Sequence, residues 1–190
     1  MHHPSPPKHF LTPLQKVPCT FQLDIPGLGF LDNSSHALKS GTKLDLPLWL
    51  AEPLTFNSVS GTPIVNLELP PSLSPQVISA LKASPKNVDL RAQAQHFYAL
   101  AARMLEIFGD EEELELGTVL YETFRSRAVE IGDHAANAGG ANRGGGGAGV
   151  GTEGVEFLRG LEEEERRLFR GSHESAKATK AWMGEVKKTA

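Results

Sequence analysis

Residues 44–54 have the sequence LDLPLWLAEPL, which predicts a strand that runs directly into a short apolar helix. Leu44 and Leu46 alternate with a polar residue, as in a half-buried strand, and Leu46 precedes a proline, which favours extended backbone. Pro47 suits the first position of a helical turn because its φ is preset and its missing N–H is not needed there. Pro53 is expected to keep the helix short.

Three large apolar side chains, Leu48, Trp49 and Leu50, fall within about one turn of this helix. A strand followed by a stubby apolar helix is typical of a docking element. The same pattern also fits a small local core in which Trp49 is simply buried. Both interpretations stay open at this point.

The composition is that of an ordinary soluble, intracellular protein. The chain has 190 residues, of which 39% are hydrophobic and 22% charged. No apolar run approaches the roughly 18 residues that a membrane span needs. The opening MHHPSPPKHFLTP has prolines where a secretory signal requires an unbroken apolar core. The single cysteine, Cys19, cannot form an internal disulfide and is expected to be a small buried hydrophobic residue in a reducing cytoplasm or nucleus.

The net charge of -4 excludes a broad electropositive surface. The only candidate basic patch lies near the C-terminus and consists of Lys177, Lys180, Lys187 and Lys188. Stacked bases would call for aromatic side chains among these lysines, and only Trp182 is present. A solvated helix face is therefore favoured, and an accessory protein that binds single-stranded nucleic acid through these lysines is the alternative.

Residues 16–70 predict a small β-rich domain, because apolar residues recur at every second position between frequent turn residues. Strands are expected at residues 17–23, 42–46 and 64–69, with a further strand starting at Phe30 and Leu31, and loops at 33–41 and 57–63. The hydrophobic core of this sheet is too small to make it stable alone, so we expect the sheet to pack against another surface. Residues 1–15 are expected to form a disordered, proline-rich tail.

Residues 71–190 predict a mostly α-helical, bundle-like domain, which places the chain in the α+β class. Ser74 and Pro75 form a cap and first-turn pair that opens a short helix. Longer helices are expected at 89–108, 110–132, 154–170 and 172–188, and a flexible glycine-rich loop at 134–152.

Two details of these helices can be checked directly. The second long helix is expected to bury one apolar line: Leu116, Leu120, Phe124, Ala128 and Ile131. On the surface of the third, acid and base are spaced four residues apart in two expected pairs: Glu162 with Arg166, and Glu163 with Arg167.

No pattern in the sequence indicates a catalytic site, a cofactor site or a metal site. Gly144, Gly146 and Gly149 match the spacing of a dinucleotide-binding turn, but no strand precedes them. A nucleotide-using enzyme is therefore the least favoured hypothesis. The histidines lack zinc spacing, and His96 is expected to be half-buried rather than a ligand. Cys19 has no neighbouring base that would activate it.

Four segments resemble one protein family. They are GTKLDLPLWLAEPL at residues 41–54, NVDL at 87–90 followed by HFY at 96–98, TFRSRA at 123–128, and LEEEERRLFRGS at 161–172. Together they are similar to subunits of the eukaryotic GINS complex of the third partner-of-Sld-five type. The VPC at residues 17–19 and the PGLGFLD at 26–32 are similar to fungal members in particular.

The resemblance implies a β-rich B domain followed by a helical A domain, in an assembly with one copy each of four GINS subunits. It also implies that this heterotetramer is a non-catalytic scaffold in the nucleus, which touches DNA only indirectly. The scaffold would join the MCM motor to the Cdc forty-five protein in the CMG replicative helicase at the replication fork, in initiation and elongation.

Two segments depart from the family pattern. Members usually open with an acidic, tyrosine-containing segment, whereas this chain has MHHPSPPKHFLTPLQK at residues 1–16. The glycine-rich insert at 138–151 is not a family hallmark either, and we expect it only to lengthen a surface loop.

Neither half encloses a large core, so we single out side chains for burial or for contact with a partner subunit. These interface candidates are Leu48, Trp49, Leu50, Phe97, Tyr98, Phe124 and Trp182. Trp182 lies on a helix with a thin apolar stripe and could pack within the chain or on another subunit.

Overall fold

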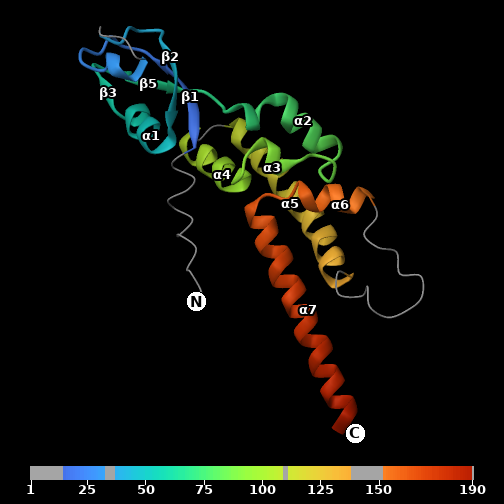
Figure 1. Cartoon of the computed structure of the whole chain (residues 1–190). Coiled ribbons are helices and arrows are strands. Elements are labelled where there is room, and N and C mark those ends of the chain that lie inside the picture. Colours follow the sequence, from blue (N-terminus) through green and yellow to red (C-terminus); the bar gives the residue numbers. More distant parts are fainter. Residues whose placement is uncertain (1–14, 33–36, 109–110, 138–151, 190) are drawn as a thin grey trace. The chain divides into compact units, whose positions relative to one another are not determined.

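The computed structural model describes residues 15–32, 37–108, 111–137 and 152–189. The chain divides into two compact units, Met1–Ser74 and Pro75–Ala190 (Figure 1). Residues 1–14 of the expected tail at 1–15 and residues 138–151 of the expected loop at 134–152 lie outside the described residues. Residues 134–137 and 152 were expected in that loop but are helical. Among those that are described, no helix is both long and apolar enough to cross a membrane.

The N-terminal unit is built on a three-stranded antiparallel sheet with the order β2-β1-β5. Its strands are β1 (Lys16–Phe21), β2 (Lys43–Pro47) and β5 (Val65–Leu67). Val17, Cys19 and Phe21 alternate along the central strand and are almost completely buried. This is the period-two pattern expected of a strand with one core face. The prediction of a small β-containing N-terminal part is confirmed.

Helix α1 (Leu48–Phe56) starts where β2 ends, as the sequence predicts, but Pro47 is the last strand residue rather than the first helical one. α1 continues through Pro53, but it is short, as expected, and ends at Phe56. Pro53 lacks only its own N–H, and its carbonyl closes the helix by accepting bonds from the backbone N–H and the Nδ2 of Asn57, at 3.1 and 2.6 Å.

Two local predictions for this unit are wrong. The strand expected at Phe30 is a 3₁₀ turn, η3 (Gly29–Asp32), which forms because the Leu31 N–H donates to the Leu28 carbonyl at 3.0 Å. The expected loop at 57–63 contains a small hairpin, β3 (Ser58–Val59) with β4 (Thr62–Pro63). Its two central residues, Ser60 and Gly61, both have positive φ, as a type I′ turn requires. A further 3₁₀ turn, η4 (Pro71–Leu73), follows the sheet.

The described part of the C-terminal unit is helical, as predicted. Its helices are α2 (Pro75–Ala83), α3 (Leu90–Gln93), α4 (Phe97–Phe108), α5 (Glu111–Asn137), α6 (Thr152–Arg159) and α7 (Glu163–Thr189). The helix predicted from Asp89 is divided into α3 and α4, because Ala94 takes an extended conformation between them. Asp89 is the expected N-cap, and its Oδ1 accepts the Ala92 N–H at 2.8 Å.

Two glycines do not end helices where the sequence predicts. α5 passes through Gly132 to Asn137, because Ile131 and Ala135 on either side are buried, and their packing outweighs the cost of about 1 kcal/mol for a helical glycine. α7 is likewise continuous across Gly171. The helix expected at 154–170 is interrupted instead at Gly160. A Cβ on this residue would lie 3.3 Å from the Asp89 Cα, and the Gly160 carbonyl accepts the Arg91 N–H at 3.2 Å.

Candidate functional site

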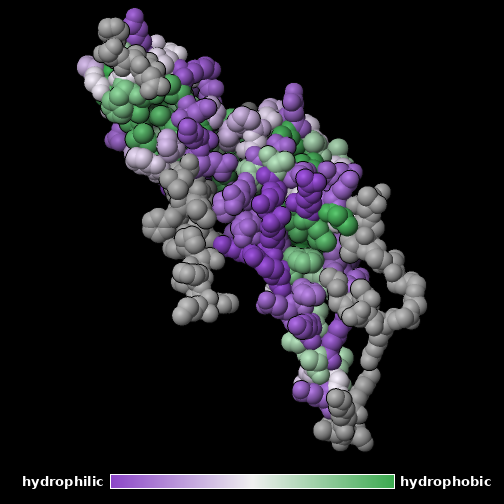
Figure 2. Space-filling view, viewed as in Figure 1, coloured by the Kyte–Doolittle hydropathy of each residue, from purple (hydrophilic) through white to green (hydrophobic). Residues whose placement is uncertain are grey.

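The outer face of α1 exposes two aromatic side chains. Trp49 is 55% exposed and Phe56 is 63% exposed, and their spacing of seven residues places them on one side of the helix. Pro53 lies exposed between them, and Val59 in the adjoining hairpin is exposed as well. Figure 2 shows hydrophobic atoms on the surface of this unit. We call these four residues the α1 face.

A second apolar surface lies on α5. Tyr121 and Val129 are about two-thirds exposed, and Phe124 is partly exposed. Phe124 was predicted to be buried, but the buried side of α5 runs through Leu120, Thr123, Arg127, Ile131 and Ala135 instead, which turns Phe124 outward. The Phe124 ring still meets the ring of Tyr98 edge-on, with centroids 5.2 Å apart. We call Tyr121, Phe124 and Val129 the α5 face.

The third surface is the distal part of α7, which extends past the end of α5 (Figure 1). Every side chain from residue 177 to 185 is exposed. Trp182 and Met183 are among them, at 63% and 52% exposure. Figure 2 shows hydrophilic and hydrophobic side chains mixed along this helix.

The interface candidates therefore fall into three groups. Leu48 and Phe97 are fully buried within the chain. Leu50 and Tyr98 are half-buried. Trp49 and Trp182 are more than half exposed and Phe124 is partly exposed, so among the candidates these three offer a surface to a partner.

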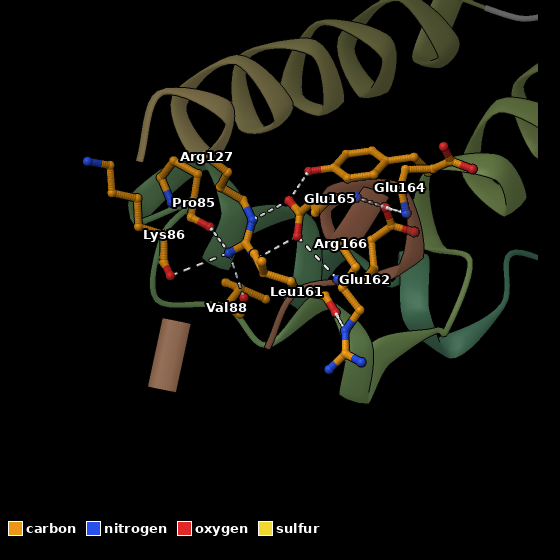
Figure 3. A network of polar contacts seen from close by, with 10 residues as sticks. Pro85, Lys86, Val88, Arg127, Leu161, Glu162, Glu164, Glu165 and Arg166 are labelled. Carbon is orange, nitrogen blue, oxygen red and sulfur yellow. Dashed lines mark hydrogen bonds and ion pairs between the residues drawn. The ribbon is translucent and has the colours of Figure 1, made fainter. Parts of the chain in front are cut away.

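A buried ion pair joins α5 to α7 (Figure 3). Arg127 and Glu165 are 1% and 0% exposed. The Arg127 Nε donates to Glu165 Oε1 at 2.6 Å and Nη2 donates to Oε2 at 2.9 Å, which is the two-pronged geometry that suits a guanidinium and a carboxylate.

The remaining polar atoms of this pair are also engaged. Arg127 Nη1 donates to the carbonyls of Pro85 and Val88, both at 3.0 Å, in the connection between α2 and α3 (Figure 3). The Tyr98 hydroxyl of α4 donates to Glu165 Oε1 at 3.0 Å. The Arg127 guanidinium carbon lies 4.8 Å from the centre of the Phe157 ring of α6, a cation–π contact. We call Tyr98, Arg127, Phe157 and Glu165 the arginine network, and it links most elements of the helical unit.

Glu165 also takes part in the N-terminal cap of α7. Glu162 Oε1 accepts the backbone N–H groups of Glu164 and Glu165, at 2.6 and 3.0 Å, and Glu165 Oε2 accepts the Glu162 N–H at 3.2 Å. This reciprocal arrangement is a capping box with glutamate in both roles. The predicted surface pair of Glu162 with Arg166 is therefore wrong, because Glu162 is buried in the cap and Arg166 Nε donates to the Leu161 carbonyl. The predicted pair of Glu163 with Arg167 is present, at 3.8 Å.

One atom of this cap lacks a partner. Among the described residues, Glu162 Oε2 is the buried side-chain oxygen or nitrogen without a hydrogen bond. Burial raises the pKa of Glu162 to about 7, and the nearby carboxylates of Glu165 and Glu164 add to this rise, while the N–H groups that it accepts oppose it. Burial and the charge of Glu165 also raise the pKa of the Tyr98 phenol above its usual range, so that this hydroxyl remains a donor.

We expect Glu162→Gln to remove a pH dependence of stability. Below the unfolded pKa of 4.5, Glu162 is protonated in both the folded and the unfolded state, so its titration does not change the free energy of unfolding. Between pH 4.5 and about pH 7, Glu162 ionises in the unfolded chain only, so the free energy of unfolding falls as the pH rises. Glutamine keeps the capping oxygen but cannot ionise. The variant should be more stable above pH 7, by on the order of 2 kcal/mol, and unchanged near pH 4.

Urea unfolding followed by circular dichroism at several pH values would measure this difference. Glu163→Gln, which removes a neighbouring partly exposed carboxylate, is the matched control and should keep the wild-type pH profile. A Glu162→Gln variant with the wild-type profile would show that this carboxyl titrates normally.

The described residues hold no group of three or more His, Cys, Asp or Glu side chains that could bind a metal ion. His96 is half-buried, and its carbonyl accepts the Leu100 N–H. Cys19 is buried, and burial raises the pKa of its thiol to about 11, so no thiolate forms there at neutral pH.

Sequence reasoning missed Arg127, Phe157 and Glu165. One signal was available, because Arg127 lies four residues before Ile131 on the buried side of α5. A charged residue at a core position of an amphipathic helix requires a buried partner. Apart from Phe157, the members of the network lie in residues 96–98, 123–128 and 161–172, and the Val88 carbonyl lies in 87–90. These are the segments on which the family resemblance rests in this unit.

Comparison with known proteins gives a consistent result. The family model described as PSF3 N-terminal domain matches residues 8–56, and the one described as GINS complex protein helical bundle domain matches residues 72–184. The chain is 50% identical over 180 residues to the DNA replication complex GINS protein psf3 of Aspergillus fumigatus, which covers 94% of each chain. It is 37% identical over 184 residues to the Saccharomyces cerevisiae protein of that name, covering 88% of this chain and 91% of the relative. For the Schizosaccharomyces pombe protein the identity is 34% over 172 residues, covering 90% and 92%.

Proposed function

Because this chain belongs to the Psf3 family of GINS complex subunits, which act in DNA replication, we propose that it is a non-catalytic scaffold subunit in a heterotetramer of four different GINS subunits. In this proposal the assembly works in the nucleus and joins the MCM motor to the Cdc forty-five protein during initiation and elongation. The names of the fungal relatives support the replication role. Residues 16–70 would act as the B domain and residues 71–190 as the A domain.

The observation that carries this proposal is the amount of apolar side chain left open on both units. Trp49, Phe56, Tyr121, Val129 and Trp182 are each more than half exposed. Single exposed apolar residues are ordinary, but aromatic residues that gather on helix faces mark sites of protein contact. Tryptophan and tyrosine are also the residues that contribute most to binding in interfaces.

We assign the contacts to the three surfaces defined above. The exposed candidates Trp49, Phe124 and Trp182 each belong to one of them, and sister subunits would cover all three. Leu48, Leu50, Phe97 and Tyr98 support these surfaces from the side of the core. Their role is to hold the exposed aromatics in place.

Co-expression with the three sister subunits tests the proposal. We expect the chain alone to aggregate through its apolar faces, and the co-expressed set to yield a particle with one copy of each subunit by native mass spectrometry. The double variant Trp49→Ala with Phe56→Ala should stay folded, because both side chains are exposed, but should weaken the assembly roughly a hundredfold.

Lys39→Ala changes an exposed polar side chain of the same unit and is the matched control, which should assemble normally. A wild-type chain that forms a stable monomer in the presence of the three sister subunits would contradict the proposal.

A further inference from the structure

Buried charges do not balance at the start of α7. In the described part of the chain, the buried charged residues are Arg127, Glu162 and Glu165, so one guanidinium is available for two carboxyl groups (Figure 3). Glu165 already binds Arg127 through two hydrogen bonds, which leaves no buried base for Glu162 among these residues. An ionised carboxyl group is costly to bury without a cation.

The two oxygens of Glu162 have different surroundings. Oε1 accepts the backbone N–H groups of Glu164 and Glu165, and so caps the first turn of α7. Oε2 is buried and has no hydrogen bond within the described residues. Ionisation would place charge on this unpaired oxygen, whereas a neutral carboxyl group keeps Oε1 as the capping acceptor and carries its proton on Oε2. The geometry therefore favours the neutral form.

Other charged or titratable groups surround this cap. On α7 itself, Glu163 and Glu164 contact Arg167 at 3.8 and 3.5 Å. Arg166 Nε donates to the Leu161 carbonyl. The neighbouring elements contribute Tyr98 of α4, His96 before it, Arg127 of α5, Lys86 between α2 and α3, Asp89 and Arg91 at the start of α3, and Arg159 of α6. Among the described residues, none of these groups donates to Glu162 Oε2.

The rest of α7 is attached by contacts that do not involve this cap. Leu168 and Phe169 pack on a buried cluster that contains Ile131. Further along, His173 Nδ1 lies 3.1 Å from the Ala135 carbonyl oxygen. These contacts lie beyond the first turn, so that turn can open while the remainder of the helix stays packed on α5.

We propose that Glu162 binds a proton on Oε2 and is a proton-dependent cap, which keeps the first turn of α7 closed while the proton is bound. In the protonated state one carboxylate and one guanidinium remain in the buried site, and their charges balance. When the proton passes to solvent water, Glu162 and Glu165 are both negative, and the first turn opens so that Glu162 reaches water. The cap lies within this chain, so it does not depend on the proposed function.

Hydrogen exchange measured by mass spectrometry at several pH values tests the proton-dependent cap. The sample is the co-expressed assembly, or the dilute full-length chain if no assembly forms. The protection of residues 163–166, corrected for the intrinsic exchange rate, should fall roughly tenfold per pH unit between about pH 5 and pH 7, and then level off. The reason is that the closed turn holds its proton up to about pH 7, whereas the open turn releases it near the ordinary pKa of 4.5.

Low concentrations of urea distinguish this local opening from global unfolding. Opening one turn exposes little surface, so the exchange of residues 163–166 should not respond to urea below the unfolding transition. The exchange of α4 should respond, because its buried residues are exposed only when the helical unit unfolds.

Variants identify the group that titrates. Glu162→Gln should remove the pH dependence and raise the protection of residues 163–166 at pH 8 by up to roughly 300-fold, because an amide keeps the capping oxygen and cannot ionise. Glu163→Gln is the matched control and should exchange like the wild type. Carbon-13 NMR of the labelled glutamate carboxyl groups measures the same titration in the wild type, where Glu162 should change near pH 7 and Glu165 should remain ionised.

Three results would overturn the proton-dependent cap. Constant protection between pH 5 and pH 7, or a Glu162 carboxyl signal that titrates near pH 4.5, would show that no proton is held there. An unchanged pH dependence in Glu162→Gln would assign the effect to another group. Exchange of residues 163–166 that follows urea together with α4 would show that this turn opens only by global unfolding. None of these results bears on the proposed function, which co-expression tests separately.

Discussion

Arg127→Ala is expected to lower the free energy of unfolding of the helical unit by about 3–5 kcal/mol. The substitution leaves the Glu165 carboxylate fully buried without its cation, and it removes the donor that serves the Pro85 and Val88 carbonyls. Most small domains have only 5–15 kcal/mol in total, so a loss of this size would unfold much of the unit at 37 °C. The start of α7 should be released first, because Glu165 also belongs to its cap.

Native-state hydrogen exchange of the amides of α5 and α7, in the assembled complex, measures this loss region by region. Arg125→Ala is the matched control: it removes an exposed arginine two residues earlier, whose contact with Glu122 is long at 3.7 Å and worth at most about 1 kcal/mol. Arg127→Lys should recover only part of the loss, because an ammonium group cannot span both the carboxylate and the carbonyls. An Arg127→Ala chain that exchanges like the Arg125→Ala chain would show that the ion pair is not important for stability.

Phe97→Ala is expected to have the second largest effect, a loss of about 3–5 kcal/mol in the free energy of unfolding. The Phe97 ring is 0% exposed and meets the Tyr98 ring edge-on, with centroids 5.6 Å apart. Its removal would leave a cavity beneath α4, in the hydrophobic core of the helical unit. It would also loosen Tyr98, whose hydroxyl donates to the arginine network.

Phe124 offers a matched comparison, because its ring also meets the Tyr98 ring edge-on but is 37% exposed. Phe124→Ala should lose only about 1 kcal/mol of stability, and its larger effect should be on assembly. Urea unfolding gives the stability difference, and native mass spectrometry of the co-expressed subunits gives the assembly. If both variants lost stability equally, Phe124 would have to be counted as core and not as interface.

The elements that could be predicted from sequence are those determined locally. The passage from β2 into α1 follows from the alternation of Leu44 and Leu46 and from Pro47, which act over a few residues. The same holds for the Asp89 cap and for the start of α2 at Pro75. Each depends on backbone preferences that neighbouring residues impose.

The errors arise where packing outweighs such preferences. Gly132 and Gly171 are weak helix formers, but α5 and α7 continue through them, in α5 because the neighbours of Gly132 are buried. The spacing of Arg127 from Ile131 places it on the buried side of α5, but it does not identify the partner. Only the fold brings Arg127 and Glu165 together at 2.6 Å. The exposure of Trp49 and Trp182 likewise could not be told from burial in a local core, since both are expected from the same apolar spacing.

The most direct measurement is hydroxyl-radical footprinting of Trp49 and Trp182 in the purified four-subunit assembly, with the urea-unfolded chain as reference. Both side chains are more than half exposed in the chain by itself. We expect the assembly to protect both indoles strongly, because sister subunits cover the α1 face and the distal part of α7. Oxidation of both at the rate of the unfolded chain, in a particle of the correct mass, would contradict a role for these surfaces in holding the complex together.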